Sequence, residues 1–529
     1  MVRAPQGWRR VATSLGIVAA LIAGVLFVPG SVTGWAAAPV TFIWGKSGDA
    51  DSLDSPTSTN GEAYEVTTQI FNILVRAVPG KTDIEPDLAT SWSVSPDGLV
   101  WTFKLRQGVT FHDGTPFNAE AVKINWDRWA NSHNPALYQY WDSFMNDYFQ
   151  EAKVVDPYTI QIVLKKPNSP MLQNLTIISF QMTSPASMKQ YPTPETLGLH
   201  PVGTGPFKFV DWVRDDHVTL VANPNFFRKG LPKVQRLIER VIKDNSARFL
   251  ALKSGEISAM ELPNTDDVKV AQSDPNLKVG YRPPFNTSWL AFNTNDPLFK
   301  DIRIRQAVAY AINRQAIVQG LYSGLGEVAT QFMPPGMWGR ASSPPAIPYD
   351  PAKSKQLLAE AGYPNGFSFN FWYIPVSRPY FPNGKEIGTA IASDLGKVGI
   401  RANLLTEDWA TFLKDERQTN KMPMYMGGWI GDNGDPDDWL GFFFPKYDAT
   451  SASLSYNNPA VFDLINRAKV ETSQAKRAQM YAQATTLILK DLPRIPIAHA
   501  RGPLLMRKNV EGLIGQPDAN EYMELVYFK

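Results

Sequence analysis

The sequence contains no cysteine. This absence excludes disulfide bonds, thiolate nucleophiles, zinc–thiolate sites and iron–sulfur clusters, and it also excludes a lipid-modified cysteine as a membrane tether. Histidine is scarce as well: the five histidines form no H-x-x-x-H pair, and none lies in a G-x-S-x-G motif. A secreted hydrolase remains an alternative function, but no nucleophile–base pair supports it. We therefore expect no catalytic residue, no metal and no cofactor.

Basic charge is concentrated at the N-terminus. Arg3, Arg9 and Arg10 precede an uncharged apolar run over 11–28, and small residues follow up to Ala38. This order is typical of a signal peptide over 1–38 that is cleaved after Ala38. A retained transmembrane anchor is the alternative, because the run reaches the lower limit for crossing a bilayer. The paired arginines also allow export by the twin-arginine route.

The remaining chain has almost no net charge. Without the three arginines of the signal segment, 49 of the 52 basic residues stand against 50 acidic residues. The pI of 8.4 therefore belongs to the precursor and does not indicate nucleic-acid binding. No second apolar run approaches membrane-spanning length. These features predict a mature protein that is free outside the cytoplasm, in the periplasm, without a lipid anchor.

The chain is longer than one hydrophobic core usually organises, so its 529 residues predict at least two lobes. The clearest pattern runs from Phe367 to Trp429. Strands are expected at 367–374, 400–405 and 424–429, and helices at 384–398 and 409–419. Such alternation predicts βαβ units and a parallel sheet.

Several other elements have readable ends. Asp350-Pro351 and Asn458-Pro459 each open a helix, and Gly362 ends the first of them. One long amphipathic helix is expected over about 304–322, and its buried face holds Ala307, Val308, Ala311, Ile312 and Val318. The N-terminal half should form an α/β lobe with a strand at 40–44, a helix at about 62–78 and a strand at 101–105.

Two charged residues carry the functional argument. Arg378 and Asp432 each follow an expected parallel strand, 54 positions apart. Ligands of open α/β sheets bind beyond the carboxyl ends of the strands, so both side chains should face one crevice. A guanidinium can grip a carboxylate with two hydrogen bonds, and a carboxylate can hold an ammonium. Together they would recognise the two ends of a short zwitterionic peptide.

Each anchor also has a purely structural interpretation. Arg378 could form a surface or lobe-internal ion pair. Asp432 could make an Asx turn or β-turn, because Asp-Asn-Gly and Asp-Pro are strong turn formers. Calcium is a further alternative for the loop over 431–437, which lacks the alternating oxygen ligands and the distal Glu of a helix–loop–helix calcium site.

Aromatic residues near the anchors could line a pocket for peptide side chains, or could simply belong to the core; they are Trp372, Tyr380, Trp409 and Trp429. The loop from Gly45 to Asp49, with Ser47 at its centre, could offer backbone donors from the opposite lobe. Its glycines are equally compatible with a plain turn.

Six short motifs follow one another along the chain after the expected signal peptide. Each is common by itself, but together they are specific for one protein family. They are Asp87-Leu88-Ala89 with Trp92, the segment 101–109, Phe111-His112-Asp113-Gly114, the segment 201–207, Arg305-Gln306-Ala307 with Tyr310-Ala311, and the segment 334–339. With these motifs the chain resembles the extracytoplasmic solute-binding proteins, family 5, of ABC peptide importers. Arg378-Pro379-Tyr380, Trp429 and the segment 431–437 make it most similar to the dipeptide-binding members.

The resemblance implies a fold and a set of roles. Arg378 would hold the peptide carboxylate and Asp432 the amino terminus, with Trp409 near a side-chain pocket. The fold would be α/β, a two-lobe periplasmic binding protein of type II, cluster C. Lobe I would comprise 39–286 plus 500–529, with an inserted subdomain at about 85–199, and lobe II 287–499. The chain would cross between the lobes twice.

The resemblance also implies partners. A monomer would deliver a short peptide to permease subunits of the inner membrane, with separate ATPase subunits. A longer peptide, glutathione-like conjugate, haem, oligosaccharide or metal chelate is the alternative cargo. Dipeptide binders of this type often carry a disulfide in the first lobe, which this chain cannot form, and this departure concerns the loop over 45–54.

Overall fold

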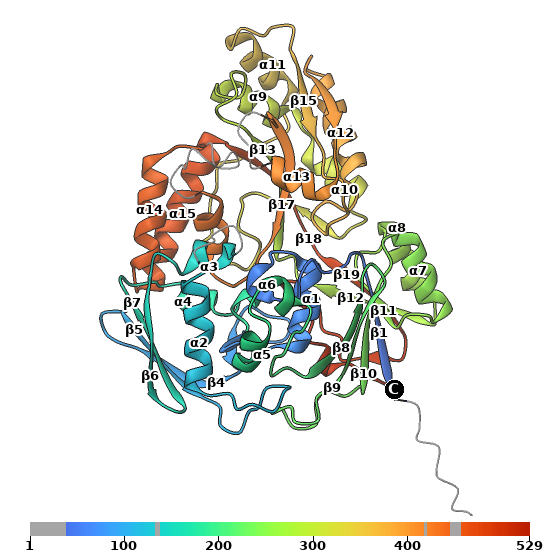
Figure 1. The fold of residues 1–529 in the computed structure, drawn as a ribbon. Coiled ribbons are helices and arrows are strands. Elements are labelled where there is room, and N and C mark those ends of the chain that lie inside the picture. Colours follow the sequence, from blue (N-terminus) through green and yellow to red (C-terminus); the bar gives the residue numbers. More distant parts are fainter. Residues whose placement is uncertain (1–38, 133–137, 417–420, 445–455) are drawn as a thin grey trace, which may run out of the picture. The chain divides into compact units, whose positions relative to one another are not determined.

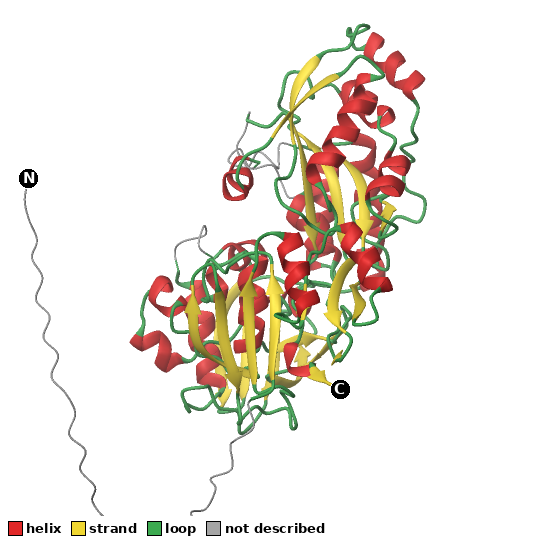
Figure 2. Cartoon of the chain, turned by 90° about the vertical axis from the view of Figure 1, so that its right-hand side faces the viewer, coloured by secondary structure: helices red, strands yellow, loops and turns green. Residues whose placement is uncertain are grey.

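A computed structural model describes residues 39–132, 138–416, 421–444 and 456–529. The expected signal peptide, with its cleavage site, lies outside these residues. Within them, no helix is both long and apolar enough to cross a membrane. Helices and strands are mixed along the whole described chain, so the expected α/β class is confirmed (Figure 2).

Lobe I is built on a seven-stranded mixed sheet (Figure 1). Its strands, in spatial order, are β12 (Leu277–Arg282), β19 (Gly502–Arg507), β11 (Ala259–Met260), β1 (Thr41–Lys46), β10 (Arg236–Val241), β9 (His217–Ala222) and β8 (Phe207–Val213). β1 is parallel to β10 and β11. β19, from the C-terminal part of the chain, thus belongs to the same sheet as β1, the first strand of the described residues.

A four-stranded antiparallel sheet lies in the region expected to be an inserted subdomain. Its order is β4 (Ala89–Val94), β5 (Val100–Leu105), β7 (Thr159–Leu164) and β6 (Phe149–Asp156). Helix α2 (Ala119–Ala130) packs on it through Trp126 and Trp129, which are fully buried in an aromatic cluster with Trp141.

Lobe II is built on a six-stranded sheet. Its order is β14 (Gly326–Val328), β18 (Arg494–Ala500), β13 (Asn286–Phe292), β17 (Met424–Ile430), β15 (Ser368–Trp372) and β16 (Arg401–Leu405). β15 is parallel to both β16 and β17, whereas β13 is antiparallel to β17 and β18. The expected parallel unit is therefore present, within a mixed sheet.

The chain passes between the two large sheets twice. It leaves the first sheet at the end of β12 and enters the second at β13, and it returns from β18 to β19 through Arg501. These passages are the two hinge crossings of the expected two-lobe fold. The residue boundaries given for the lobes remain a prediction.

Helices pack around the sheets of both lobes. They are α1 (Gly61–Ile70), α3 (Gln139–Phe144), α4 (Met171–Asn174), α5 (Pro185–Gln190), α6 (Pro194–Gly198), α7 (Asn245–Ser254), α8 (Thr265–Ser273), α9 (Ile302–Ala311), α10 (Arg314–Leu321), α11 (Pro351–Glu360), α12 (Gly384–Gly396), α13 (Trp409–Asp415), α14 (Pro459–Val470) and α15 (Gln474–Asp491). Asp350 and Asn458 cap α11 and α14 as predicted.

Two predicted helices are wrong in extent. The long helix over 304–322 is broken into α9 and α10, because Ile312 is extended and the Asn313 side chain caps α10 by accepting from the backbone N–H of Ala316. All five residues expected on the buried face are buried. The helix expected over 62–78 ends at Ile70, whose carbonyl accepts a hydrogen bond from the Gly205 N–H at 2.8 Å. A short strand, β2 (Val75–Ala77), follows.

Candidate functional site

Arg378 lies six residues beyond the end of β15, in a tight turn. Its backbone exchanges two hydrogen bonds with Phe381, at 3.1 and 3.0 Å, and the Ser377 hydroxyl donates to the carbonyl of Pro382. This turn fixes the backbone from which the guanidinium projects. The expected position beyond the carboxyl end of a parallel strand is therefore observed.

The guanidinium of Arg378 reaches toward the other lobe. Its Nη1 lies 3.4 Å from Oε1 of Glu62, in the first turn of α1, and both side chains are less than one fifth exposed. The Trp409 ring lies 5.3 Å from the guanidinium carbon. Burial lowers the pKa of Arg378, but Glu62, Tyr380 and Glu261 together outweigh it, so the net shift is upward and the side chain stays charged. The ion pair is neither on the surface nor internal to one lobe.

Asp432 follows the end of β17 by two residues, in an acidic loop. The Asx turns of this loop are made by its neighbours: Asn433 accepts from the Asp435 N–H and Asp435 from the Asp437 N–H, at 2.8 and 2.9 Å. The backbone N–H of Asp432 donates to Oδ2 of Asp438. The Asp432 side chain is thus not used to make the turn, and its Oδ2 is buried without a hydrogen-bond partner.

The charges of this loop divide into two groups. Asp435 is paired with Arg477 at 2.7 Å and Asp437 with Lys469 at 3.6 Å, whereas the described residues supply no ion pair for Asp432 or Asp438. Burial raises the pKa of Asp432 to about 7; a hydrogen bond from Tyr140 opposes the rise and Asp518 adds to it. Burial, and next Asp432 itself, raise the pKa of Asp438.

Each anchor lines a pocket that takes residues from both lobes. The Asp432 pocket is bordered by Thr82, Thr176 and Asp518 of lobe I and by the 431–434 segment of lobe II. The Arg378 pocket is bordered by Leu262, Pro263 and Pro503 of lobe I and by Tyr322, Ser377 and Pro382 of lobe II. The two pockets share no lining residue.

The aromatic residues differ in their surroundings. Tyr380 is buried against β17, where a Cβ on Gly428 would lie 2.2 Å from its ring, and burial raises its pKa to about 12. Trp429 stacks on Phe442 with ring centroids 5.2 Å apart, and its Nε1 lies 3.4 Å from the buried carboxyl of Asp438. Tyr380 and Trp409 thus belong with Arg378, and Trp429 with the acidic loop.

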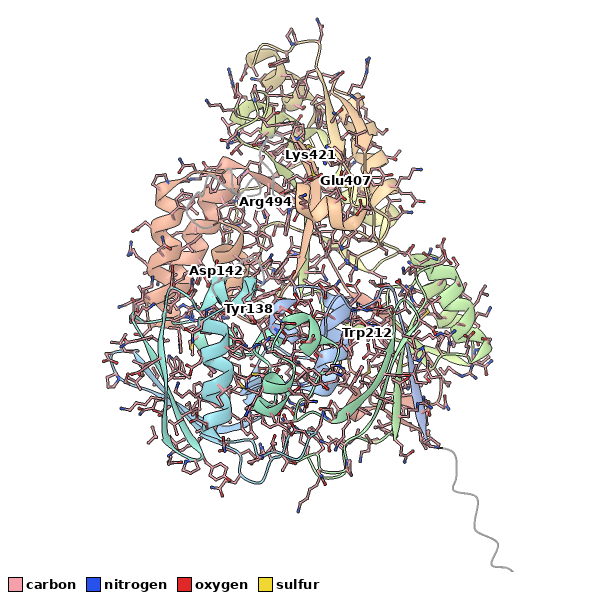
Figure 3. The ribbon with its side chains drawn as sticks, viewed as in Figure 1. Tyr138, Asp142, Trp212, Glu407, Lys421 and Arg494 are labelled. Atoms are coloured by element: carbon pink, nitrogen blue, oxygen red, sulfur yellow. The ribbon has the colours of Figure 1, made fainter. Side chains whose placement is uncertain are left out.

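Trp372 lies elsewhere in lobe II. The Nζ of Lys421 is 5.6 Å from its ring and 3.2 Å from Oε2 of Glu407. Figure 3 shows Lys421 and Glu407 close together in lobe II. The structure does not bring Trp372 to either anchor pocket.

Ser47 has its donors engaged within its own lobe. Its hydroxyl and its backbone N–H both donate to Oε1 of Glu261, at 2.9 and 3.2 Å, and Glu261 in turn faces Arg282. Ser47 borders neither anchor pocket. The next residue, Gly48, packs on Glu62: a Cβ there would lie 3.2 Å from Cγ of Glu62.

Noncovalent contacts hold the loop over 47–54. The indole N–H of Trp212, labelled in Figure 3, donates to Oδ1 of Asp49 at 2.9 Å, and Arg214 stacks on this indole and donates to the Ala50 carbonyl. Asp54 pairs with Arg128. These bonds tie both ends of the loop to the body of lobe I, without a disulfide.

The sequence interpretation missed four residues around the anchors: Glu62, Tyr140, Asp438 and Asp518. Asp438 could have been found, because it continues the acidic run of the loop. Glu62 looks like an ordinary acid in the first turn of a helix, where carboxylates are favoured by the helix dipole. Tyr140 and Asp518 carry no local signal, since long-range folding alone places them beside Asp432.

No metal or cofactor ligand set stands out: within the described ranges, no three His, Asp or Glu side chains are grouped so that they could hold a metal ion. The arrangement can bind charged groups by hydrogen bonds and ion pairs. It offers one interlobe cation and one buried anion beyond two neighbouring parallel strands.

The chain matches the family model described as bacterial extracellular solute-binding proteins, family 5 middle, over residues 83–451. It is 36% identical to "Heme-binding protein A" of Haemophilus influenzae over 475 residues, 86% of each protein. It is 32% identical to "Dipeptide-binding protein" of Escherichia coli over 509 residues, 92% of this chain and 94% of that protein.

A solved structure has the same architecture. The ABC transporter-associated periplasmic binding protein DppA from Helicobacter pylori, in complex with the peptide STSA, superposes with a TM-score of 0.83 and 31% identity. The match covers 93% of this chain and 98% of that one.

Proposed function

Because the chain belongs to the bacterial extracellular solute-binding proteins, family 5, whose members bind solutes for transport and are not enzymes, we propose that it captures dipeptides or other short peptides between its lobes. The loaded protein delivers the peptide to the permease subunits of an ABC importer, which separate ATPase subunits drive. It acts as a periplasmic monomer that its signal peptide exports.

The observation that carries this proposal is the state of the two anchors. Arg378 has a counter-ion only across the lobes among the described residues, and Asp432 has a buried carboxylate oxygen without a partner. A buried charge is costly unless it is paired and hydrogen-bonded. A zwitterionic peptide can serve both anchors at once: its carboxylate can replace Glu62 at Arg378, and its ammonium can pair with Asp432.

The remaining site residues have roles around these anchors. Tyr380 and Trp409 border the carboxylate end, and Trp429 borders the ammonium end through Asp438. Ser47 stands beside Gly48 and Glu62 in lobe I; because Glu261 engages both of its donors, we assign the contact to the ligand after closure to its backbone carbonyl. Ligand contacts from both lobes stabilise the closed form, as in hinge-closing binding proteins.

Haem is the second candidate cargo, because the Haemophilus influenzae relative is named for haem binding. Haem carries two carboxylates and no ammonium, so it can use Arg378 and gives Asp432 no partner. The names of the Escherichia coli and Helicobacter pylori relatives favour peptides instead.

Identification of the co-purified ligand tests the function directly. The exported protein is purified without denaturation, then unfolded, and the released small molecules are identified by mass spectrometry and visible absorption. We expect short peptides, which then rebind in calorimetry. Recovery of haem or a sugar as the tightly held ligand, with no heat on adding a dipeptide mixture, would contradict the proposal.

The affinity for a dipeptide should depend on pH with a maximum between about 7 and about 8. Below about 7 the Asp432 carboxyl of the empty protein binds a proton, which the ammonium must displace, so affinity rises as pH increases toward 7. Above about 8 a peptide α-amino group loses its own proton, so affinity falls again. Calorimetry at pH 6 in buffers of different ionisation enthalpy should detect proton release on binding.

The variant Asp432→Asn tests whether the proton released on peptide binding comes from Asp432 or from a neighbouring group. Asp438, Asp518 and Tyr140 also contribute to the titration around Asp432. The variant should bind dipeptide more weakly at every pH and should lose both the acid limb and the proton release. An unchanged acid limb in the variant assigns the titration to another group and removes Asp432 from the ammonium site.

A further inference from the structure

Glu62 is the one acidic side chain that forms an ion pair with Arg378 among the described residues, and nothing in the proposed function uses it. It belongs to α1 of lobe I, whereas Arg378 follows β15 of lobe II, 316 residues later in the chain. The contact therefore exists only while the lobes are together. Glu62 stands where a ligand carboxylate would meet the guanidinium.

The contact is poor for a buried ion pair. One Nη1–Oε1 distance of 3.4 Å joins the two groups, and no second hydrogen bond makes it bidentate within the described part of the chain. Charge-assisted hydrogen bonds of this type are normally about 2.7–2.9 Å long, and Arg–carboxylate pairs are frequently bidentate. A free peptide carboxylate can adopt the better geometry, so it can outcompete Glu62 for the guanidinium.

The surroundings of Glu62 hold its side chain in place. It lies in the first turn of α1, where Asn60 caps the helix and the dipole favours a negative charge. Its backbone carbonyl accepts a hydrogen bond from Lys46, and Gly48 packs on its side chain. A ligand carboxylate that reaches Arg378 therefore arrives beside a carboxylate that has little room to retreat, and like charges at close range repel.

From this geometry we infer that Glu62 is a built-in competitor of the ligand carboxylate, which pairs with Arg378 in the empty closed protein and lowers the affinity for the peptide. This inference rests on the proposed function. Glu62 would then limit how tightly the peptide is held. When the peptide dissociates, Glu62 replaces its carboxylate as the partner of Arg378. A group that merely oriented Arg378 for the ligand would act in the opposite direction.

Glu62→Gln tests the direction of the effect. The change removes the charge and keeps the shape, so calorimetry with a dipeptide that binds the wild type should show a three- to tenfold gain in affinity. The same dipeptide with a C-terminal amide should show no gain, because it has no carboxylate for Glu62 to oppose. Weaker binding of the free dipeptide by the variant would overturn the inference, since Glu62 would then position Arg378 for the ligand. Unchanged binding would also overturn it, since Glu62 would then have no effect on the ligand.

Glu120→Gln is the matched control. Glu120 occupies the same place in α2 as Glu62 in α1, two residues after a capping asparagine, but it is exposed. It should leave the affinity unchanged, so an equal gain in this variant would also overturn the inference by showing a nonspecific charge effect. Melting curves of both variants check folding, and Glu62→Ala provides a second removal of the charge.

The outcomes separate this inference from the proposed function. If the wild type binds no short peptide, the function itself fails and the inference fails with it. If the wild type binds and Glu62→Gln gains nothing, the inference alone fails.

Discussion

Replacing Arg378 with alanine should weaken dipeptide binding by about 30-fold or more. Removal of one partner from a buried, hydrogen-bonded charge pair costs about 2–5 kcal/mol, and each 1.4 kcal/mol corresponds to about tenfold in affinity. The loss should be this large because the guanidinium is more than four fifths buried and two hydrogen bonds to the peptide carboxylate disappear together. Calorimetry with the dipeptide recovered from the native protein measures it.

Two comparisons make the result specific. Arg467→Ala removes an exposed arginine of lobe II, paired with Asp463 on the surface, and should change the affinity by less than about twofold. The wild type should also bind the dipeptide amide much more weakly than the free dipeptide, since the amide lacks the other half of the same contact. Equal affinity of Arg378→Ala and wild type for the free dipeptide removes Arg378 from the mechanism.

Local sequence patterns predicted much of the fold. The strand–helix alternation between 367 and 429 corresponds to β15, α12, β16, α13 and β17, because Asn383 and Asp408 cap the two helices and the strands around them are short and mostly apolar. Asp350-Pro351 fixed the start of α11 in the same way. The errors lie where a contact with a distant segment determines the end of a helix. The Gly205 N–H donates to the Ile70 carbonyl at the end of α1, and the Asn313 N–H donates to Asp394 where α10 begins.

The site was less accessible from sequence, for a physical reason. Arg378 and Asp432 could be proposed because both follow strands of one parallel pair, which is a local pattern. What surrounds them depends on contacts between lobes: Glu62, 316 residues from Arg378, and Asp518, which lies in the C-terminal segment, both come from lobe I. No pattern in the sequence indicates that Asp432 has no cation partner within the part of the chain that the structure describes, while Asp435 in the same loop has Arg477.

A network of buried charged residues lies in lobe I at the end of β12, where the chain first crosses to lobe II. Arg282, the last residue of β12, donates two hydrogen bonds of 2.7 Å to the two oxygens of Glu521, and it lies 3.4 Å from Glu261. Glu261 holds Ser47, and the neighbouring Lys46 is 3.1 Å from Glu239. All these charged groups are buried, so each carboxylate depends on a cation within the cluster.

Arg282→Met should lower the free energy of unfolding by about 3–5 kcal/mol, because it leaves Glu521 and Glu261 buried without their cation. Chemical denaturation and melting curves measure the loss. Arg240→Met is the matched control: Arg240 lies in β10 of the same sheet but is 42% exposed in its pairs with Asp216 and Glu256, so it should cost less than about 1 kcal/mol. Equal losses in the two variants would contradict the assigned role of Arg282.

The deficit of Arg282→Met should shrink in acid. Burial alone raises the pKa of Glu261, but the charges of Arg282 and Arg248 and hydrogen bonds with Glu65 and Ser47 together lower it to about 2. Below its unfolded value of 4.5, Glu261 in the wild type therefore contributes less and less to stability as pH falls toward 2. Without Arg282 the largest of these lowering contributions is lost, so the pKa of Glu261 rises and protonation of Glu261 costs the folded variant less stability as pH falls. The free energies of unfolding of the wild type and Arg282→Met should therefore converge as pH falls from about 7 to about 3. A constant difference would show that the variant loses stability through packing and not through charge.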